Sequence, residues 1–147
     1  MADASANKMR IIFDVSVIAF LLNWAWEYAQ CSFFIHLAAP ATHAEMLRAS
    51  LGDVLLTWVP IGVLSLGTHS FCGFLERWTW SRLVSLTVIN LVLAMSVERL
   101  GLSKGRWAYQ SFNPTVLNLH LSVLPLLQLA ILVPLTLWLA KRSRFTK

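Results

Sequence analysis

Long apolar stretches alternate with short polar segments along the whole chain. A helix needs about 20 apolar residues to cross the roughly 30 Å hydrocarbon core of a bilayer. Four stretches are long enough, at residues 9–34, 52–74, 81–100 and 119–140. The pattern therefore predicts four transmembrane helices. Because no repeat or linker separates them, we expect one all-α integral membrane domain over residues 1–147, built as a compact four-helix bundle.

Composition supports the membrane interpretation. The chain is 57% hydrophobic and 13% charged, with a mean hydropathy of +0.64, whereas soluble domains carry about 25% charged residues. The net charge is +5. The basic residues gather at the ends of the predicted helices, which is typical of topology signals and anionic-lipid contact. We therefore expect membrane lipids as partners and no nucleic acid.

The distribution of Lys and Arg also predicts an orientation. With four spans and a cytoplasmic N-terminus, eight basic residues fall on the inner side and four on the outer side, as the positive-inside rule requires. Both termini are then in the cytoplasm (N-in, C-in). The inner set is Lys8, Arg10, Arg77, Arg82, Lys141, Arg142, Arg144 and Lys147, and the outer set is Arg48, Arg99, Lys104 and Arg106.

The first apolar stretch contains a polar stripe. Asn23, Glu27 and Gln30 are spaced i, i+4 and i+7, so a helix places them on one face. A carboxylate at bilayer depth costs from a few to more than about ten kcal/mol, depending on the estimate. Glu27 therefore needs a partner, a proton or a ligand, and it is the best lead to function.

Polar residues of the other predicted helices fall at the same depth. Asp53 opens the second helix, Glu98 closes the third, and Asn118, His120 and Gln128 belong to the fourth. We expect a polar pocket near the outer leaflet. Its candidate catalytic residues are Glu27, Asp53 and Glu98, and its candidate substrate-binding residues are Asn23, Trp26, Gln30, Arg106, Trp107, Tyr109, His120 and Gln128.

Each of these residues also has a structural interpretation. The carboxylates can form ion pairs with Arg99 or Arg106, which would fold over the pocket as a counter-charge. Amide side chains such as Asn23 and Gln30 commonly join helices to one another in membranes. His120, beside an interface, fits a hydrated histidine more readily than a ligand.

Other motifs add little chemistry. Thr42 followed by Glu45 fits a capping box and predicts a helix start near His43. Cys31 and Cys72 lie near opposite ends of two spans, so we expect no disulfide between them, and their redox role stays open. The sequence has no paired Glu-x-x-His, HExxH or CxxC motif. No motif requires a metal or another cofactor.

Two resemblances extend this interpretation. Residues 98–109 (ERLGLSKGRWAY), 124–128 (LPLLQ), 23–27 (NWAWE) and 52–53 resemble a family of small bacterial multi-pass membrane proteins of unassigned function. That resemblance implies a helical fold with about four spans in the bacterial cytoplasmic (inner) membrane. A fainter one is to membrane-bound carotenoid enzymes, namely the small-subunit lycopene cyclases and the carotenoid hydratases.

The fainter resemblance rests on an acidic residue before a Gly-x-Trp/Tyr-x-Tyr-like turn. Glu98, Gly105, Trp107 and Tyr109 match that outline. The chain departs from the cyclases after Pro125, where Leu-Leu-Gln stands in place of paired acidic residues.

Three functional hypotheses remain. The first is an acid–base enzyme that acts on an apolar, isoprenoid-like or lipid substrate. The second is a non-catalytic accessory subunit of a larger respiratory or photosynthetic membrane complex. The third is a small transporter or proton path, which would need polar groups such as Asn90 and Asp14 to connect the pocket inward.

Overall fold

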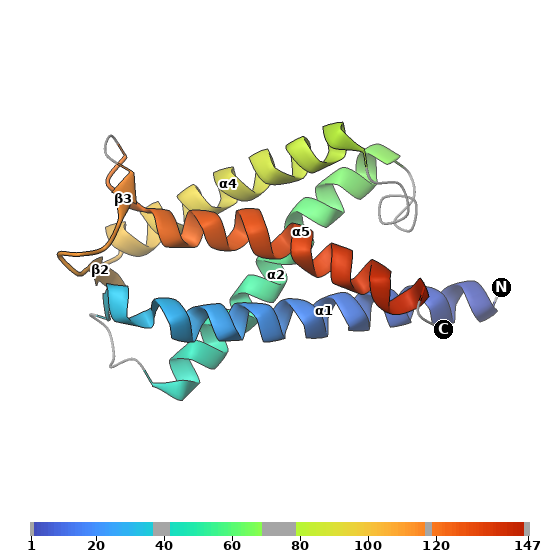
Figure 1. Ribbon diagram of the computed structural model, residues 1–147, viewed down its shortest axis with the longest axis horizontal. Coiled ribbons are helices and arrows are strands. Elements are labelled where there is room, and N and C mark those ends of the chain that lie inside the picture. Colours follow the sequence, from blue (N-terminus) through green and yellow to red (C-terminus); the bar gives the residue numbers. More distant parts are fainter. Residues whose placement is uncertain (1, 37–41, 69–78, 117–118, 146–147) are drawn as a thin grey trace.

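The computed structural model describes residues 2–36, 42–68, 79–116 and 119–145. This part of the chain forms four long helices: α1 (Ala2–Gln30), α2 (His43–Thr68), α4 (Trp80–Ser103) and α5 (Val123–Phe145) (Figure 1). Each has a segment long and apolar enough to cross a membrane, namely Lys8–Phe33, His43–Leu66, Trp80–Ser103 and Val123–Ser143. The prediction of four long apolar helices that pack together is confirmed.

Two helix starts differ in how well the sequence predicted them. Helix α2 begins at His43, where the Thr42 hydroxyl accepts the N–H of Glu45 at 3.3 Å. This confirms the predicted cap, while the Glu45 carboxylate pairs with Arg48 at 2.8 Å. Helix α5 begins at Val123, four residues later than residue 119, because His120 has a φ of 51°. Residues 69–74 of the second predicted span, with Cys72, lie outside the described residues.

The purely α-helical prediction misses the segments that join the helices at one end. A short 3-10 turn, η1 (Cys31–Phe33), leads from α1 into β1 (Phe34–His36), which pairs antiparallel with β2 (Trp107–Tyr109). A second antiparallel pair joins β3 (Thr115–Val116) and β4 (Leu121–Ser122). We call this end of the bundle the strand end. The N-terminal end of α1 and the C-terminal end of α5 lie at the opposite end (Figure 1).

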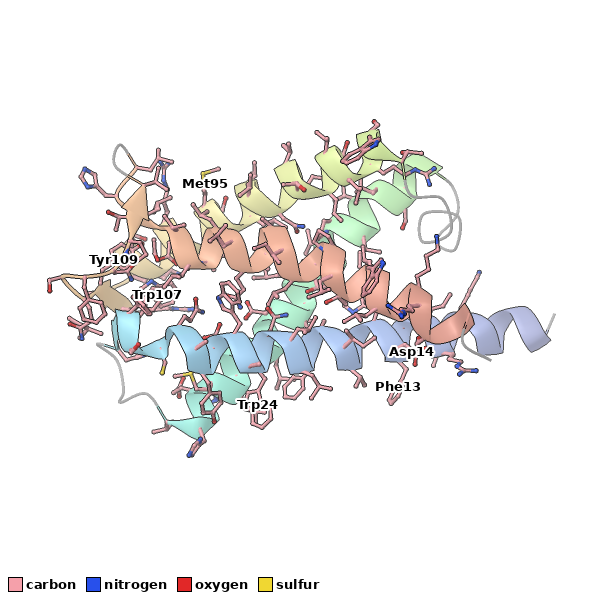
Figure 2. All side chains as sticks on the ribbon, in the orientation of Figure 1. Phe13, Asp14, Trp24, Met95, Trp107 and Tyr109 are labelled. Carbon is pink, nitrogen blue, oxygen red and sulfur yellow. The ribbon has the colours of Figure 1, made fainter. Side chains whose placement is uncertain are left out.

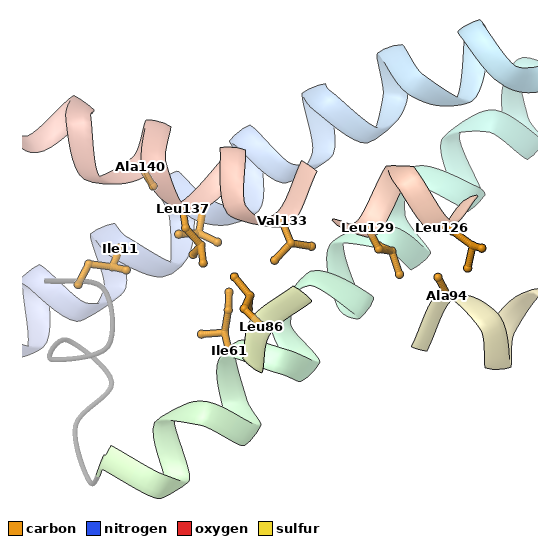
Figure 3. Packing of buried hydrophobic residues seen from close by; sticks show 10 residues of the cluster. Ile11, Ile61, Leu86, Ala94, Leu126, Leu129, Val133, Leu137 and Ala140 are labelled. Carbon is orange, nitrogen blue, oxygen red and sulfur yellow. The ribbon is translucent and has the colours of Figure 1, made fainter. Parts of the chain in front are cut away.

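Helix α5 packs against both α1 and α4, and α2 crosses the bundle obliquely against α1 and α4 (Figure 1). The buried core runs along α5 and takes residues from every helix (Figure 3). By contrast, Phe13 and Trp24 of α1 point away from the bundle (Figure 2) and are 66% and 41% exposed. In a bilayer such side chains contact lipid. The buried residues of the hydrophobic core are Ile11, Val15, Ile61, Leu86, Ala94, Leu126, Leu129, Val133, Leu137 and Ala140.

Gly101 anchors the strand end to α4. A Cβ atom at this position would lie 2.0 Å from the ring of Trp107, which is closer than any stable contact. The absence of a side chain therefore lets the Trp107 ring lie directly on the last turns of α4. That position brings the Trp107 indole N–H within 3.4 Å of the Glu98 carboxyl.

Substituting Gly101→Ala should lower stability by about 1–3 kcal/mol, the usual cost of overpacking. Gly62→Ala is the matched control, because a Cβ there meets nothing within 4 Å and Ala favours a helix over Gly by about 1 kcal/mol. Denaturation of the purified variants in mixed micelles measures both effects. Equal stability of the two alanine variants would contradict the contact between Gly101 and Trp107.

Candidate functional site

The side-chain amide of Gln128 connects three helices. Its Nε2 atom lies 2.8 Å from the Asp53 carboxyl of α2, 3.1 Å from the Glu27 carboxyl of α1 and 3.0 Å from Asn23 Oδ1, also on α1. Gln128 itself is only 4% exposed. An amide nitrogen carries two hydrogens, so three oxygen acceptors converge on two donors. We call Asn23, Glu27, Gln30, Asp53 and Gln128 the carboxyl–amide cluster.

Gln30 completes this cluster. Its Nε2 donates to the Glu27 carboxyl at 2.8 Å and to Gln128 Oε1 at 3.1 Å. The indole N–H of Trp26 donates to Gln30 Oε1 at 2.9 Å. The structure thus brings the predicted stripe of α1 together with Asp53 and Gln128, and it places Trp26 behind Gln30.

The carboxyl groups of Glu27 and Asp53 both lie within hydrogen-bond distance of Gln128 Nε2, so they are neighbours where α1 meets α2. No ion pair between described residues includes either group; the pairs found are Arg10–Asp14 and Arg48–Glu45. Glu27 and Asp53 therefore form a pair of neighbouring carboxyl groups that the amides of Gln128 and Gln30 orient.

Glu98 belongs to a neighbouring group at the strand end. Its carboxyl accepts the Tyr109 hydroxyl at 2.5 Å and the Trp107 indole N–H at 3.4 Å, and the residue is 2% exposed. The Tyr109 oxygen in turn accepts the backbone N–H of Ser122 at 3.0 Å. Glu98 is near enough to Glu27 for electrostatic interaction, but no hydrogen bond between described residues joins it to the carboxyl–amide cluster. Figure 2 shows Tyr109 and Trp107 together at the strand end.

Asn113 and Ser122 connect the strand end to the helices, and neither is among the site residues predicted from the sequence. The Ser122 hydroxyl donates to Asn113 Oδ1 at 2.8 Å and accepts the N–H of Leu124 at 3.2 Å, at the start of α5. Asn113 Nδ2 donates to the carbonyl of Phe33 at 2.9 Å. An Asn-Pro dipeptide such as that at 113–114 is typical of a turn, but the bond from Asn113 to Phe33 joins residues 80 positions apart.

Two predicted site residues lie elsewhere. Arg106 is exposed, and its backbone N–H bonds to the Gly101 carbonyl at 3.0 Å. No ion pair between described residues includes Arg106, so its role as a counter-charge over the pocket stays a prediction. His120 is also exposed, in the left-handed conformation before α5. Asn118 lies outside the described residues.

His36 is a residue that the sequence analysis missed. It lies in β1, opposite Trp107. Its Nε2 atom is buried with no hydrogen-bond partner among the described residues, and the ring interacts electrostatically with Glu27. The first predicted span ended at residue 34, so nothing in the local pattern indicated that the chain folds back toward α1.

Among the described residues, no three His, Cys, Asp or Glu side chains are arranged to hold a metal ion. No protein-family model, curated protein or solved structure matches the chain. The class of the protein therefore follows from its own four apolar helices, which indicate a multi-pass integral membrane protein. The two resemblances drawn from short motifs stay predictions.

Burial, and then the hydrogen bond to Glu98, raise the pKa of the Tyr109 phenol above its usual value of about 10. The folded state therefore favours the neutral phenol. This contribution to stability is fully present below about pH 10, where the unfolded phenol ionises, and it is lost as the pH rises through the folded pKa.

We predict that phenolate absorbance in a Tyr28→Phe protein, which retains only Tyr109, rises at higher pH in the folded than in the denatured protein. Tyr28 and Tyr109 are the two tyrosines of the chain, so the signal belongs to one residue. Coincident titration curves for the folded and denatured protein would rule out a buried, hydrogen-bonded Tyr109.

Proposed function

We propose that this protein is a membrane-embedded acid–base enzyme that acts on an apolar, isoprenoid-like or lipid substrate. The Glu27–Asp53 carboxyl pair would serve as proton donor and acceptor. One observation carries the proposal: carboxyl groups from two different candidate spans, Glu27 and Asp53, meet at the Gln128 amide nitrogen, at 3.1 Å and 2.8 Å. Structural amides explain helix association in membranes, but they do not require two carboxyls at one point.

The proposed reaction follows from what the pair can donate and accept. The protonated carboxyl gives its proton to one carbon of an alkene, so that an O–H bond breaks, a C–H bond forms and a carbocation results. The carboxylate then removes a proton from an adjacent carbon and a new double bond forms. The net change is an isomerisation, or a cyclisation if a second double bond attacks the cation first. No oxidant or reductant is consumed.

Nearby aromatic rings support carbocation chemistry, because a ring face attracts a cation. Trp26 contacts Gln30 of the carboxyl–amide cluster, and Trp107 and Tyr109 contact Glu98. Trp24 does not share this position, since it points outward (Figure 2) and packs between Phe20 and Tyr28. Under the proposal, Glu98 sets the local charge beside the pair.

The membrane would provide both a path for the substrate and apolar surroundings for the reaction. A substrate dissolved in lipid can approach between helices without crossing water, and the low dielectric of the bilayer strengthens the interactions of the pair. The predicted N-in orientation would place the carboxyl–amide cluster in the outer leaflet of a bacterial inner membrane.

We expect Glu27→Gln and Asp53→Asn each to lower turnover of an isoprenoid alkene by about 10²-fold or more, the usual contribution of a general acid or base. Each amide keeps the shape of the side chain but cannot donate and accept a proton as a carboxyl group does. Glu45→Gln is the matched control, because this carboxylate is paired with Arg48 at the surface. Product analysis by chromatography on a panel of linear and cyclic isoprenoids measures the effect.

Full activity of Glu27→Gln on a substrate that the wild-type protein converts would contradict the proposal. Loss of activity in Glu45→Gln as well would point to a general effect on folding.

A second proposal is that the chain is an accessory subunit of a larger membrane complex. It is supported by the small buried share of three spans: only 22% of the apolar windows of α1, α2 and α4 is buried within the chain. Lipid or partner helices must cover the rest. Purification as a stable protein without partners would leave this second proposal unsupported.

A further inference from the structure

Asn90 is a buried polar residue in the apolar middle of the bundle. It lies on α4 one turn from Leu86 and one turn from Ala94, so all three residues share a face. Asn90 is 0% exposed, and neither atom of its side-chain amide has a hydrogen-bond partner among the described residues. Buried amides in proteins are almost always hydrogen-bonded, to protein or to ordered water. The Asn90 amide is therefore in position to hold a small polar molecule.

The neighbours of Leu86 and Ala94 locate Asn90 relative to the other helices. Leu86 lies beside Ile61 of α2 and near Val133 of α5, and Ala94 lies near Leu126 (Figure 3). Helix α4 runs toward the strand end, whereas α2 and α5 run away from it (Figure 1). Because Asn90 is one turn nearer the strand end than Leu86, helical spacing puts it at the level of residue 57 of α2 and residue 130 of α5.

The turns of α2 and α5 at this level each contain a backbone carbonyl released by a proline. Pro60 has no N–H for the carbonyl of Leu56, and Pro134 has none for the carbonyl of Ala130. In membrane helices, carbonyls released in this way are satisfied by neighbouring side chains or by ordered water. The Asn90 amide, with one donor and one acceptor group unpartnered, lies at the level of both carbonyls.

This level also adjoins the carboxyl pair. Thr57 is fully buried one turn from Asp53, and its hydroxyl donates to the Asp53 backbone carbonyl at 2.8 Å. The polar groups of Asp53 and Thr57 on α2 thus extend from the carboxyl–amide cluster to the level of Asn90.

We propose that Asn90 binds an internal water molecule between α2, α4 and α5, and that this water site gives the Glu27–Asp53 pair its route for proton exchange with solvent. Water matches the donors and acceptors present, because it can accept from the Asn90 amide nitrogen and donate to carbonyl oxygens. Buried waters typically make about three hydrogen bonds, which Asn90 and the two released carbonyls can supply. The second part of the inference rests on the proton of the proposed function, whereas the water site itself does not.

Nuclear magnetic resonance tests the water site directly. In a ¹⁵N-labelled protein in lipid nanodiscs, the side-chain NH₂ signals lost in Asn90→Leu identify Asn90. We expect these signals to show cross-peaks to water in the wild-type protein. Cross-peaks to lipid acyl protons alone, or to protein methyl groups alone, would overturn the water site.

Infrared spectroscopy tests the exchange route. The C=O stretch of a protonated carboxyl shifts when the protein is transferred to deuterated buffer, and the rate of that shift reports proton exchange. We expect Asn90→Leu to slow the exchange several-fold and Asn90→Ser, which keeps a polar group and leaves room for water, to retain most of the wild-type rate. Ser96→Ala is the control on the same helix, because the Ser96 hydroxyl is exposed and already bonds to the Val92 carbonyl.

The outcomes separate the two proposals. A wild-type protein with no protonated-carboxyl band would contradict the protonated carboxyl on which the proposed function depends. A band that is present but exchanges equally fast in Asn90→Leu and wild type would overturn the exchange route alone. If Asn90→Leu does not fold, the comparison of Asn90→Ser with Ser96→Ala decides the same point, since slow exchange in Asn90→Ser would contradict a water-bearing site.

Discussion

A carboxyl group within a membrane-spanning bundle must be satisfied inside the protein, and the Gln128 amide is where this chain meets that requirement. Its nitrogen reaches oxygens of Asn23, Glu27 and Asp53. This one contact links α5 to α1 and α2, and it holds both carboxyl groups at the same point. Without it, two costly groups would lie between helices with fewer partners than their oxygens require.

The strand end keeps that contact in place. Gln128 lies near the start of α5, and the first residues of α5 are fixed by Ser122, Asn113 and the carbonyl of Phe33 in η1, just after α1. Tyr109 joins the same segment to Glu98 of α4. The segment between α4 and α5 thus sets the relative positions of the helix ends, and through them the geometry of the carboxyl pair. The Gly101–Trp107 contact shows how closely this segment is seated on α4.

The sequence predicted the parts of this arrangement that follow from local periodicity. Apolar length predicted four helices, and helical spacing placed Asn23, Glu27 and Gln30 on one face. It also placed Asp53 and Gln128 at the same depth as this face, in one expected pocket. The sequence did not show that Glu98 lies outside this cluster, because the depth of a residue along its helix does not determine which neighbouring helix its side chain faces. The pairing of β1 with β2, the bond from Asn113 to Phe33 and the position of His36 depend on contacts between segments about 70–80 residues apart. No local pattern encodes these contacts.

The central claim is that Glu27 and Asp53 form one unit rather than two separate polar groups. A double-mutant cycle of Glu27→Gln and Asp53→Asn, with unfolding measured by denaturant titration in mixed micelles, tests this claim most directly. Residues that share a hydrogen-bond network show coupling free energies of about 0.5–3 kcal/mol, and a value in this range is expected here. If the two effects add to within about 0.3–0.5 kcal/mol, as for independent sites, the carboxyl pair does not exist as described.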